Sequence, residues 1–526
     1  MSTFNTENSE QLIYENGLLS LSVLGGVRLE GLDRMRVTLK IELPNSPRPP
    51  LRHNLDLYND VQLEKFIRKI AERLEVGTSV ASASLSELTA ELENYRIQQL
   101  KAQQEHQIKT YILTETEKAE ALDFLTAPNL MERTNQLIGQ SGILGEEINR
   151  LIMYVIFTSR KRSHPLHVVS LGASGTGKTH LQEKVSELIP EEDKIEITTL
   201  SENAFYYFER RALSHKLILI EDLDGAENSM YALRELQSKK RISKTIAQKN
   251  SKGETKTIHL TVEGPVSVSG CTTKEQIYED NANRSFLLYL DESEIQDQKV
   301  MEYQRALSAG KINQGDEHHA QQLLKNAQRL LEPVKIVNPY AELLHIPVEV
   351  LKPRRTNNHY LQFIEAVTFY HQFQRAQKTD ETTGEIYVET TLDDVEEANR
   401  LLKNILLHKS DELTGACRSY LERVKSYLVQ ESKQQYTNHE IRKALRENPS
   451  NQKRYNLALI SGHYIKQVKG KKGTAYSYQV VSYEEFKALR DQIDSVLDDN
   501  IERLRQFSSP PHVQNTNEPV KRKKTS

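Results

Sequence analysis

The chain has 526 residues, of which 27% are charged and 37% hydrophobic, and its formal net charge at pH 7 is -3. This composition is typical of a globular protein of about three domains, and it excludes a global positive field, so any nucleic-acid surface must be a local patch. The two cysteines, Cys271 and Cys417, are too few for a disulfide framework or a four-cysteine zinc site. The absence of a long apolar run and the polar, acidic first residues predict a cytoplasmic protein without membrane association or secretory signal.

Residues 1–112 are predicted to form an N-terminal domain of mixed α+β type. Two strand-like runs, residues 18–24 and 35–41, are separated by glycines, and helical periodicity follows within residues 61–74 and 85–107. No pattern of side chains in this part indicates chemistry, so its role is unknown.

A phosphate-binding loop of the form G-x-x-x-x-G-K-[ST] is predicted directly after a short β-rich run, residues 167–171. Its glycines let backbone N–H groups surround phosphate oxygens, and the positive end of the following helix points at the same anion. Lys178 is expected to reach the β- and γ-phosphates of ATP, and Thr179 to bind Mg²⁺. A chance glycine turn before a helix is the alternative. The predicted nucleotide-binding residues are Gly172, Ala173, Ser174, Gly175, Thr176, Gly177, Lys178, Thr179 and His180.

An apolar run, residues 217–220, predicts a buried strand from whose carboxyl end Glu221 and Asp222 emerge, with Asp224 as a third candidate. Nucleotide hydrolysis needs a carboxylate for Mg²⁺ and a group that orients water. We expect Glu221 to bind the metal together with Thr179, and Asp222 to act as the base, although the two roles are exchangeable. The alternative is a buried strand that ends in solvated acids.

Together, the phosphate loop and the acidic strand resemble the AAA+ superfamily, and within it the minichromosome maintenance (MCM) helicases. The resemblance covers roughly residues 135–410. It implies an α/β P-loop sandwich with a helical lid, which binds ATP and Mg²⁺. The acidic pair of those proteins is ordered Asp-Glu, whereas here Glu221 precedes Asp222, an inversion that is compatible with slow hydrolysis.

The resemblance also implies a hairpin that carries DNA-binding lysines. Residues 241–246 and 256–260 alternate as two strands, and residues 250–254 form the predicted turn. Lys249 and Lys252, near its tip, are expected to touch a phosphate backbone inside a ring of subunits. The alternative is a surface hairpin whose lysines protect an edge strand.

Three further residues complete the catalytic set that the resemblance implies. Thr272, with Thr273 as the second choice, would sense the γ-phosphate at the end of the next core strand. Arg284 would act as an arginine finger on a neighbouring subunit's nucleotide, which requires an oligomer. Arg355, preferred over Arg354, would be the second sensor of the lid. For each arginine the alternative is a surface ion pair.

The C-terminal part is predicted to be a winged helix. A helix with Thr437 as its N-cap, a second helix and two strands joined by a basic turn follow one another after residue 411. Lys453 and Arg454 on the second helix, and Lys471 and Lys472 in the turn, are expected to contact DNA. A winged helix that docks on protein is the alternative.

The predicted fold is therefore an α/β AAA+ P-loop sandwich with a helical lid, an α+β N-terminal domain and a C-terminal winged helix. The expected parts are residues 1–112, the ATPase core 113–297, the lid 298–410, the winged helix 411–482, and a charged helix with a basic tail, 483–526. The predicted function is that of an ATP-dependent DNA helicase, a ring and in particular a hexamer on single-stranded or forked DNA. Its setting would be replication of a mobile element, with a primase or other replication proteins as candidate partners.

Two other functions fit the same motifs. The first is an ATP-dependent DNA-binding switch, such as a transposition-target regulator or a helicase loader, which the inverted acidic pair favours. The second is an ATP-regulated transcription factor whose winged helix reads an operator. The lysine-bearing hairpin favours the helicase.

Overall fold

The computed structural model describes residues 3–6, 8–28, 34–44, 46–107, 111–172, 174–226, 229–249, 255–274, 283–468 and 476–508. The chain divides into two compact units, Met1–Ile112 and Leu113–Ser526. Among the described residues, no helix combines the length and the apolar character that crossing a bilayer requires.

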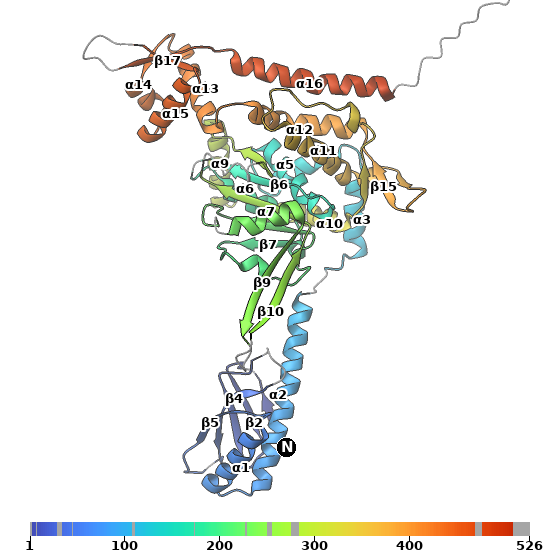
Figure 1. Ribbon diagram of the computed structural model, residues 1–526, viewed down its shortest axis with the longest axis vertical. Coiled ribbons are helices and arrows are strands. Elements are labelled where there is room, and N and C mark those ends of the chain that lie inside the picture. The colour runs from blue at the N-terminus through green and yellow to red at the C-terminus, as the bar shows by residue number, and fades with distance from the viewer. Residues whose placement is uncertain are drawn as a thin grey trace, which may run out of the picture. The chain divides into compact units, whose positions relative to one another are not determined.

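The first unit is an antiparallel sheet with two helices packed on one of its faces (Figure 1). Alternate strand residues such as Leu21 and Leu39 are buried together with Phe66 of the first helix, because successive side chains of a strand point to opposite faces. The elements are β1 (Thr3–Asn5), β2 (Gln11–Glu15), β3 (Ser20–Leu24), β4 (Arg36–Glu42), β5 (Leu51–Asp56), α1 (Asp60–Leu74) and α2 (Thr78–Gln107).

The centre of the second unit is a five-stranded parallel sheet in the order β12-β6-β11-β8-β7. Its strands are β6 (His167–Leu171), β7 (Lys194–Ile197), β8 (Lys216–Ile220), β11 (Val266–Thr272) and β12 (Phe286–Tyr289). Because the strands are parallel, their carboxyl ends lie along one edge of the sheet. Strand β11 separates β6 from β8, so the segment after β11 lies between the segments that follow β6 and β8.

Helices cover both faces of this sheet (Figure 1). Leu217 and Leu219 of β8 share a core with α5 (Glu147–Thr158) and α6 (Lys178–Ser186), whereas Ile218 and Ile220 belong to the core under α7 (Met230–Lys239). The uninterrupted apolar run of β8 is thus that of a strand buried on both faces. The predicted α/β class with a parallel sheet is confirmed.

A long antiparallel hairpin separates α7 from β11. Its strands, β9 (Arg241–Lys249) and β10 (Thr255–Glu263), pair along their whole length, from Arg241 opposite Glu263 to Lys249 opposite Thr255. Both strands are longer than the sequence predicts. Figure 1 shows the hairpin projecting from the domain that contains the sheet.

The segment predicted to be the lid, residues 298–410, is mainly helical, and α16 (Glu485–Ser508), the last helix of the described residues, packs with it. Buried Ile493, Leu497 and Leu504 of α16 join the main core, and α16 packs along α12 (Leu392–Ser410). The other elements around the sheet are α3 (Glu115–Thr126), α4 (Leu130–Gln140), α9 (Glu294–Ser308), α10 (Gln314–Leu330), α11 (Pro353–Tyr370), β13 (Lys335–Val337), β14 (Gln377–Thr379) and β15 (Ile386–Glu389).

A small globular part with its own core lies between α12 and α16 in the chain. Its elements follow in the order α13 (Gly415–Gln430), β16 (Tyr436–Thr437), α14 (Asn438–Leu445), α15 (Pro449–Ser461), β17 (Ile465–Val468) and β18 (Ser477–Val480), and the strands pair as β16-β18-β17. Thr437 is the N-cap of α14 as predicted, and it forms a capping box with Glu440, since each side chain bonds to the other's backbone N–H.

Candidate nucleotide-binding site

The loop between β6 and α6 has the backbone conformation of an anion-binding loop. Gly175 and Gly177 adopt positive φ angles of 85° and 88°, and no atom lies within 4 Å of a Cβ added at either position. Backbone conformation, rather than lack of space, therefore requires glycine there. Gly177 is the N-cap of α6, whose first turn contains no acidic residue, so the positive end of this helix is open to an anion.

The predicted phosphate-binding side chains lie at this loop. The ammonium group of Lys178 donates a hydrogen bond to the carbonyl oxygen of Gly172 at 2.8 Å, and Lys178 is only 6% exposed. His180, Ser174 and Gly175 are exposed, and Thr179 is half-buried. Ala173 lies outside the described residues. The arrangement fits a triphosphate, whose oxygens would replace the loop carbonyl as the partner of Lys178.

A buried thiol connects this loop to the acidic strand. Burial raises the pKa of Cys271, in β11, to about 12, while a hydrogen bond with Thr179 and the positive charge of Lys178 act in the opposite direction. The negative charge of Asp222 also acts on this thiol. The thiol therefore lies beside Thr179 of the phosphate loop, near the carboxyl end of β11.

The two adjacent carboxylates have different partners. Both Glu221 and Asp222 are exposed just beyond β8. The Oε1 atom of Glu221 accepts a hydrogen bond from the hydroxyl of Thr198, which follows β7, at 3.3 Å. The Oδ1 atom of Asp222 accepts the N–H of Asp224 at 2.9 Å. Glu221 thus contacts the residue that follows β7, whereas Asp222 bonds within its own loop.

Asp224 holds the predicted sensor residues. Its carboxylate accepts hydrogen bonds from the hydroxyls of Thr272, at 2.7 Å, and Thr273, at 3.0 Å, and the ammonium of Lys274 lies 3.8 Å away. Burial alone would raise the pKa of Asp224, but these hydrogen bonds lower it below its ordinary value. Asp224 is therefore ionised at neutral pH and fixes the Thr272 hydroxyl between the phosphate loop and the acidic pair.

The two predicted catalytic arginines lie at the other edge of the sheet. Arg284 precedes β12, and its Nε donates to the Ser238 hydroxyl at 2.7 Å. The charge of Arg355 reaches His359, whose ring stacks on Phe286, the first residue of β12, at 5.1 Å. Five residues of β6 separate this edge from the phosphate loop, a span of roughly 16 Å. Arg284 therefore lies at the amino ends of the strands, away from the phosphate loop.

The predicted DNA-binding residues are distributed over the hairpin and the C-terminal part. Lys453 and Arg454 are exposed on α15, and the Arg454 guanidinium lies 5.3 Å from the ring centre of Tyr455. Lys249 ends β9, but its side chain is not among the described atoms. Lys252, Lys471 and Lys472 lie outside the described residues.

Sequence reasoning missed two polar residues at the carboxyl edge, Thr198 after β7 and Glu292 after β12. A Cβ at Gly172 would lie 3.4 Å from the Oε1 atom of Glu292, so this carboxylate adjoins the first residue of the phosphate loop. One signal could have found both: in a parallel sheet, the residues that follow each strand meet at the ligand-binding edge.

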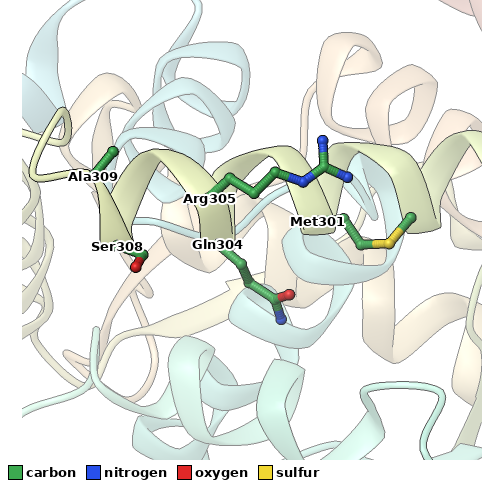
Figure 2. A pocket seen from close by; sticks show the side chains of 5 residues that line it. All are labelled: Met301, Gln304, Arg305, Ser308 and Ala309. Atoms are coloured by element: carbon green, nitrogen blue, oxygen red, sulfur yellow. The ribbon is translucent and has the colours of Figure 1, made fainter.

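A separate cavity of about 450 Å³ lies along α9. Figure 2 shows the lining side chains: Met301, Gln304, Arg305 and Ser308 come from α9, and Ala309 is its C-cap. None of the predicted nucleotide-binding residues lines it, so it is distinct from the site above.

Residues 115–333 match the family model described as the MTBMA_p00010 P-loop domain. No functionally curated protein matches the sequence. Among solved structures, the chain is similar to a full-length MCM homolog from Methanopyrus kandleri, with 12% identity over 78% of this chain and 76% of that one and a TM-score of 0.35. The Cch active helicase of SCCmec type IV is 9% identical over 93% and 99% of the two chains, with a TM-score of 0.28. Drosophila ORC bound to DNA is 10% identical over 74% and 94%, with a TM-score of 0.20. Residues 115–333 therefore form a P-loop domain, the class of domain that binds nucleoside triphosphates.

Proposed function

We propose that the chain is a DNA-dependent ATPase of the MCM-like AAA+ kind, which assembles as a ring, in particular a hexamer, and acts as a helicase or translocase. One observation carries this proposal: the phosphate loop and the carboxylates follow the carboxyl ends of their strands, whereas Arg284 precedes the amino end of β12. A complete site then requires the arginines of a second copy. A shared site of this kind joins subunits into a closed ring or an open filament.

Within one site, we assign Asp222 and Thr179 to Mg²⁺ and Glu221 to the attacking water. The hydrogen bond of Glu221 to Thr198, on the side of β8 away from β11, supports this assignment. The roles are thus exchanged relative to the first choice from the sequence. Mg²⁺, when bound, would offset the charge of the β- and γ-phosphates.

The remaining residues orient and stabilise. The Thr272 hydroxyl donates its hydrogen bond to Asp224, so its oxygen would be left to accept one from the attacking water. Arg284 and Arg355 of the next subunit would offset the charge that develops on the transferred phosphoryl group, a contribution of roughly 10³–10⁵ in turnover for an arginine finger. The loss of either arginine should therefore lower hydrolysis more than nucleotide binding.

We also propose that the part from α13 to β18 is a winged helix that binds DNA. Its order of helices and strands supports this assignment, together with exposed Lys453 and Arg454 on α15. Lys471 and Lys472 would extend the contact through the turn between β17 and β18, and Lys249 and Lys252 would do so from the hairpin. The setting in replication of a mobile element rests on the sequence resemblance alone.

Mixing two inactive variants tests the shared site. Lys178→Ala retains both arginines but cannot hold the phosphates, and Arg284→Ala retains the phosphate loop. We expect each variant alone to lack DNA-stimulated ATP hydrolysis, and their mixture to recover part of it, because some sites then combine an intact loop with an intact arginine. Arg68→Ala, on the exposed face of α1, is the matched control and should behave as wild type. No recovery in the mixture would contradict a site shared between subunits.

The ATP-dependent DNA-binding switch is the second candidate function. The inverted pair Glu221-Asp222 and the hydrogen bond of Glu221 to Thr198 favour slow turnover, which suits assembly on DNA and release after hydrolysis. Electron micrographs with a slowly hydrolysed ATP analogue, together with an unwinding assay in the presence of ATP, separate the two functions. Rings on forked DNA and ATP-driven unwinding support the helicase. Filaments on duplex DNA without unwinding support the switch.

A further inference from the structure

A cleft of about 530 Å³ lies where the β9–β10 hairpin meets the segment between β7 and β8. Its lining combines aromatic and cationic side chains, namely Tyr206, Tyr207, Phe208, Arg210, Arg241, His259, Leu260 and Thr261. Tyr207 is 64% exposed, and Tyr231 of the adjoining α7, which is electrostatically coupled to Tyr206, is 61% exposed. Large aromatic rings that remain this exposed in a folded chain indicate a binding surface.

The aromatic segment is held rigidly. Phe205 is 1% exposed in the core beneath α7. Its ring stacks on that of Phe208, with 6.3 Å between the two ring centres. The side chain of Asn203 accepts a hydrogen bond from the ammonium of Lys244, in β9, at 2.6 Å. The backbone of Tyr207 is therefore fixed on both sides. Ordering this tyrosine when a ligand stacks on its ring would cost little conformational entropy.

The charge around the cleft is positive. Arg210 and Arg211 share one carboxylate, Glu263, at 2.6 Å and 3.7 Å, and Arg241 is directly opposite Glu263 in the hairpin register. Two guanidinium groups thus share a single carboxylate, and the residue paired with Glu263 in the hairpin carries a third. Lys244 adds a fourth cation, 5.5 Å from the ring centre of Tyr206.

We propose that this cleft binds single-stranded nucleic acid, with a base stacked on Tyr207 and the neighbouring phosphates held by Arg241 and Arg211. Every base has an aromatic face, but in a duplex both faces are covered by neighbouring base pairs, so the platform accepts single strands. The surplus of arginines matches a polyanion. The inference rests on the proposed action on DNA and adds a contact that the predicted lysines at the hairpin tip do not supply.

The test measures binding of the full-length protein to two labelled probes by fluorescence anisotropy. One probe is an oligothymidylate of about 20 nucleotides, longer than the site size of a typical single-strand-binding fold, and the other is an abasic strand of the same length and charge. Wild type should bind oligothymidylate more tightly. Tyr207→Ala should weaken that binding by about fivefold or more and leave abasic binding unchanged, whereas Tyr207→Phe should retain wild-type affinity because stacking needs only the ring. Tyr483→Ala, which truncates another exposed tyrosine, is the control.

A second variant tests the phosphate contact. Arg241→Gln should reduce the slope of log affinity against log salt concentration by about 0.7 for both probes, the amount expected for one lost phosphate contact on a single strand. Wild type that binds oligothymidylate while Tyr207→Ala binds it equally well overturns the cleft and leaves the proposed function intact. Equal binding of both probes by wild type also overturns stacking in the cleft. Failure of wild type to bind any DNA overturns the proposed function itself.

Discussion

Replacing Arg418 by methionine should detach the C-terminal part from the lid. The guanidinium group is 5% exposed, and it donates two hydrogen bonds to Asp411, at 2.7 Å and 2.8 Å, and one to Glu485 at 3.0 Å. Asp411 directly follows α12, and Glu485 begins α16. Arg418 therefore ties together the two chain segments through which the C-terminal part joins the lid.

The magnitude follows from burial. Asp411 is only 1% exposed at its side chain, so removing Arg418 leaves an uncompensated buried carboxylate, at a cost of about 3–5 kcal/mol. Loss of the cation–π contact with the ring of Phe486, at 4.5 Å, adds about 1 kcal/mol. Glu485 keeps a partner, because Lys425 donates to it at 2.7 Å. We expect a total loss of about 4–6 kcal/mol for Arg418→Met.

Amide hydrogen exchange of α13 and α16 is the suitable assay, because it reports local opening rather than global unfolding. Adding Asp411→Asn to Arg418→Met removes the unpaired charge and should recover about half of the lost protection. The control is Arg423→Met on the same helix. The Arg423 side chain is half-exposed, so its ion pair with Glu447 should contribute less than about 1 kcal/mol to stability. Unchanged exchange in Arg418→Met, or a double variant no better protected than the single one, would refute the reasoning.

Three other substitutions have outcomes that the contacts determine. Gly415→Ala places a Cβ into the ring of Tyr289 and should destabilise the second unit by about 1–3 kcal/mol, measured by urea unfolding. Asp394→Asn weakens the buried pair with Arg375 and should lower stability by about 3 kcal/mol in the same assay. Burial lowers the pKa of Lys409 to about 8 from 10.5, so the unfolded chain binds more protons between pH 8 and pH 10. As the pH rises from 8 to 10, the free energy of unfolding of wild type should increase relative to that of Lys409→Met, by up to about 1.4 kcal/mol per pH unit. Thermal unfolding of both proteins at pH 8 and at pH 10 measures this difference.

Each of these substitutions has a matched control. A Cβ at Gly77 would lie 3.6 Å from its nearest neighbour, an ordinary contact, so Gly77→Ala should be neutral or slightly stabilising. Asp393→Asn changes an exposed neighbour of Asp394, and Lys403→Met changes a half-exposed lysine of the same helix as Lys409. An effect of a control as large as that of its buried counterpart would contradict the role of burial.

The phosphate loop and the acidic strand could be predicted from the sequence because each is a local pattern. Gly172 to Thr179 are consecutive, and the apolar run before Glu221 can only be a buried strand at that length. The hairpin strands were predicted too short. Their alternation weakens toward the tip, whereas the ladder continues to Lys249 opposite Thr255.

The partners of the carboxylates could not be predicted, because they depend on strand order. Thr198 meets Glu221 only since β7 lies beside β8, and Thr272 meets Asp224 only since β11 lies on the other side of β8. These pairs are separated by 23 and 48 residues along the chain. No pattern within a single strand contains that information. The same holds for Arg284, whose position at the far edge follows from the parallel pairing of β12 with β6.

The return of the last helix to the lid has the largest consequence for function. The sequence of α16 carries an apolar stripe at Ile493, Leu497 and Leu504, which predicts that one face is buried but not against what. In the structure, buried Asn500 donates to the carbonyl of His345 at 2.8 Å and accepts its N–H at 3.0 Å, which joins α16 to the lid through the backbone. The C-terminal part is thus an insertion held at both ends, not an appendage on one linker. A movement of α12 and the helices packed with it would therefore carry α15, with exposed Lys453 and Arg454, along with it.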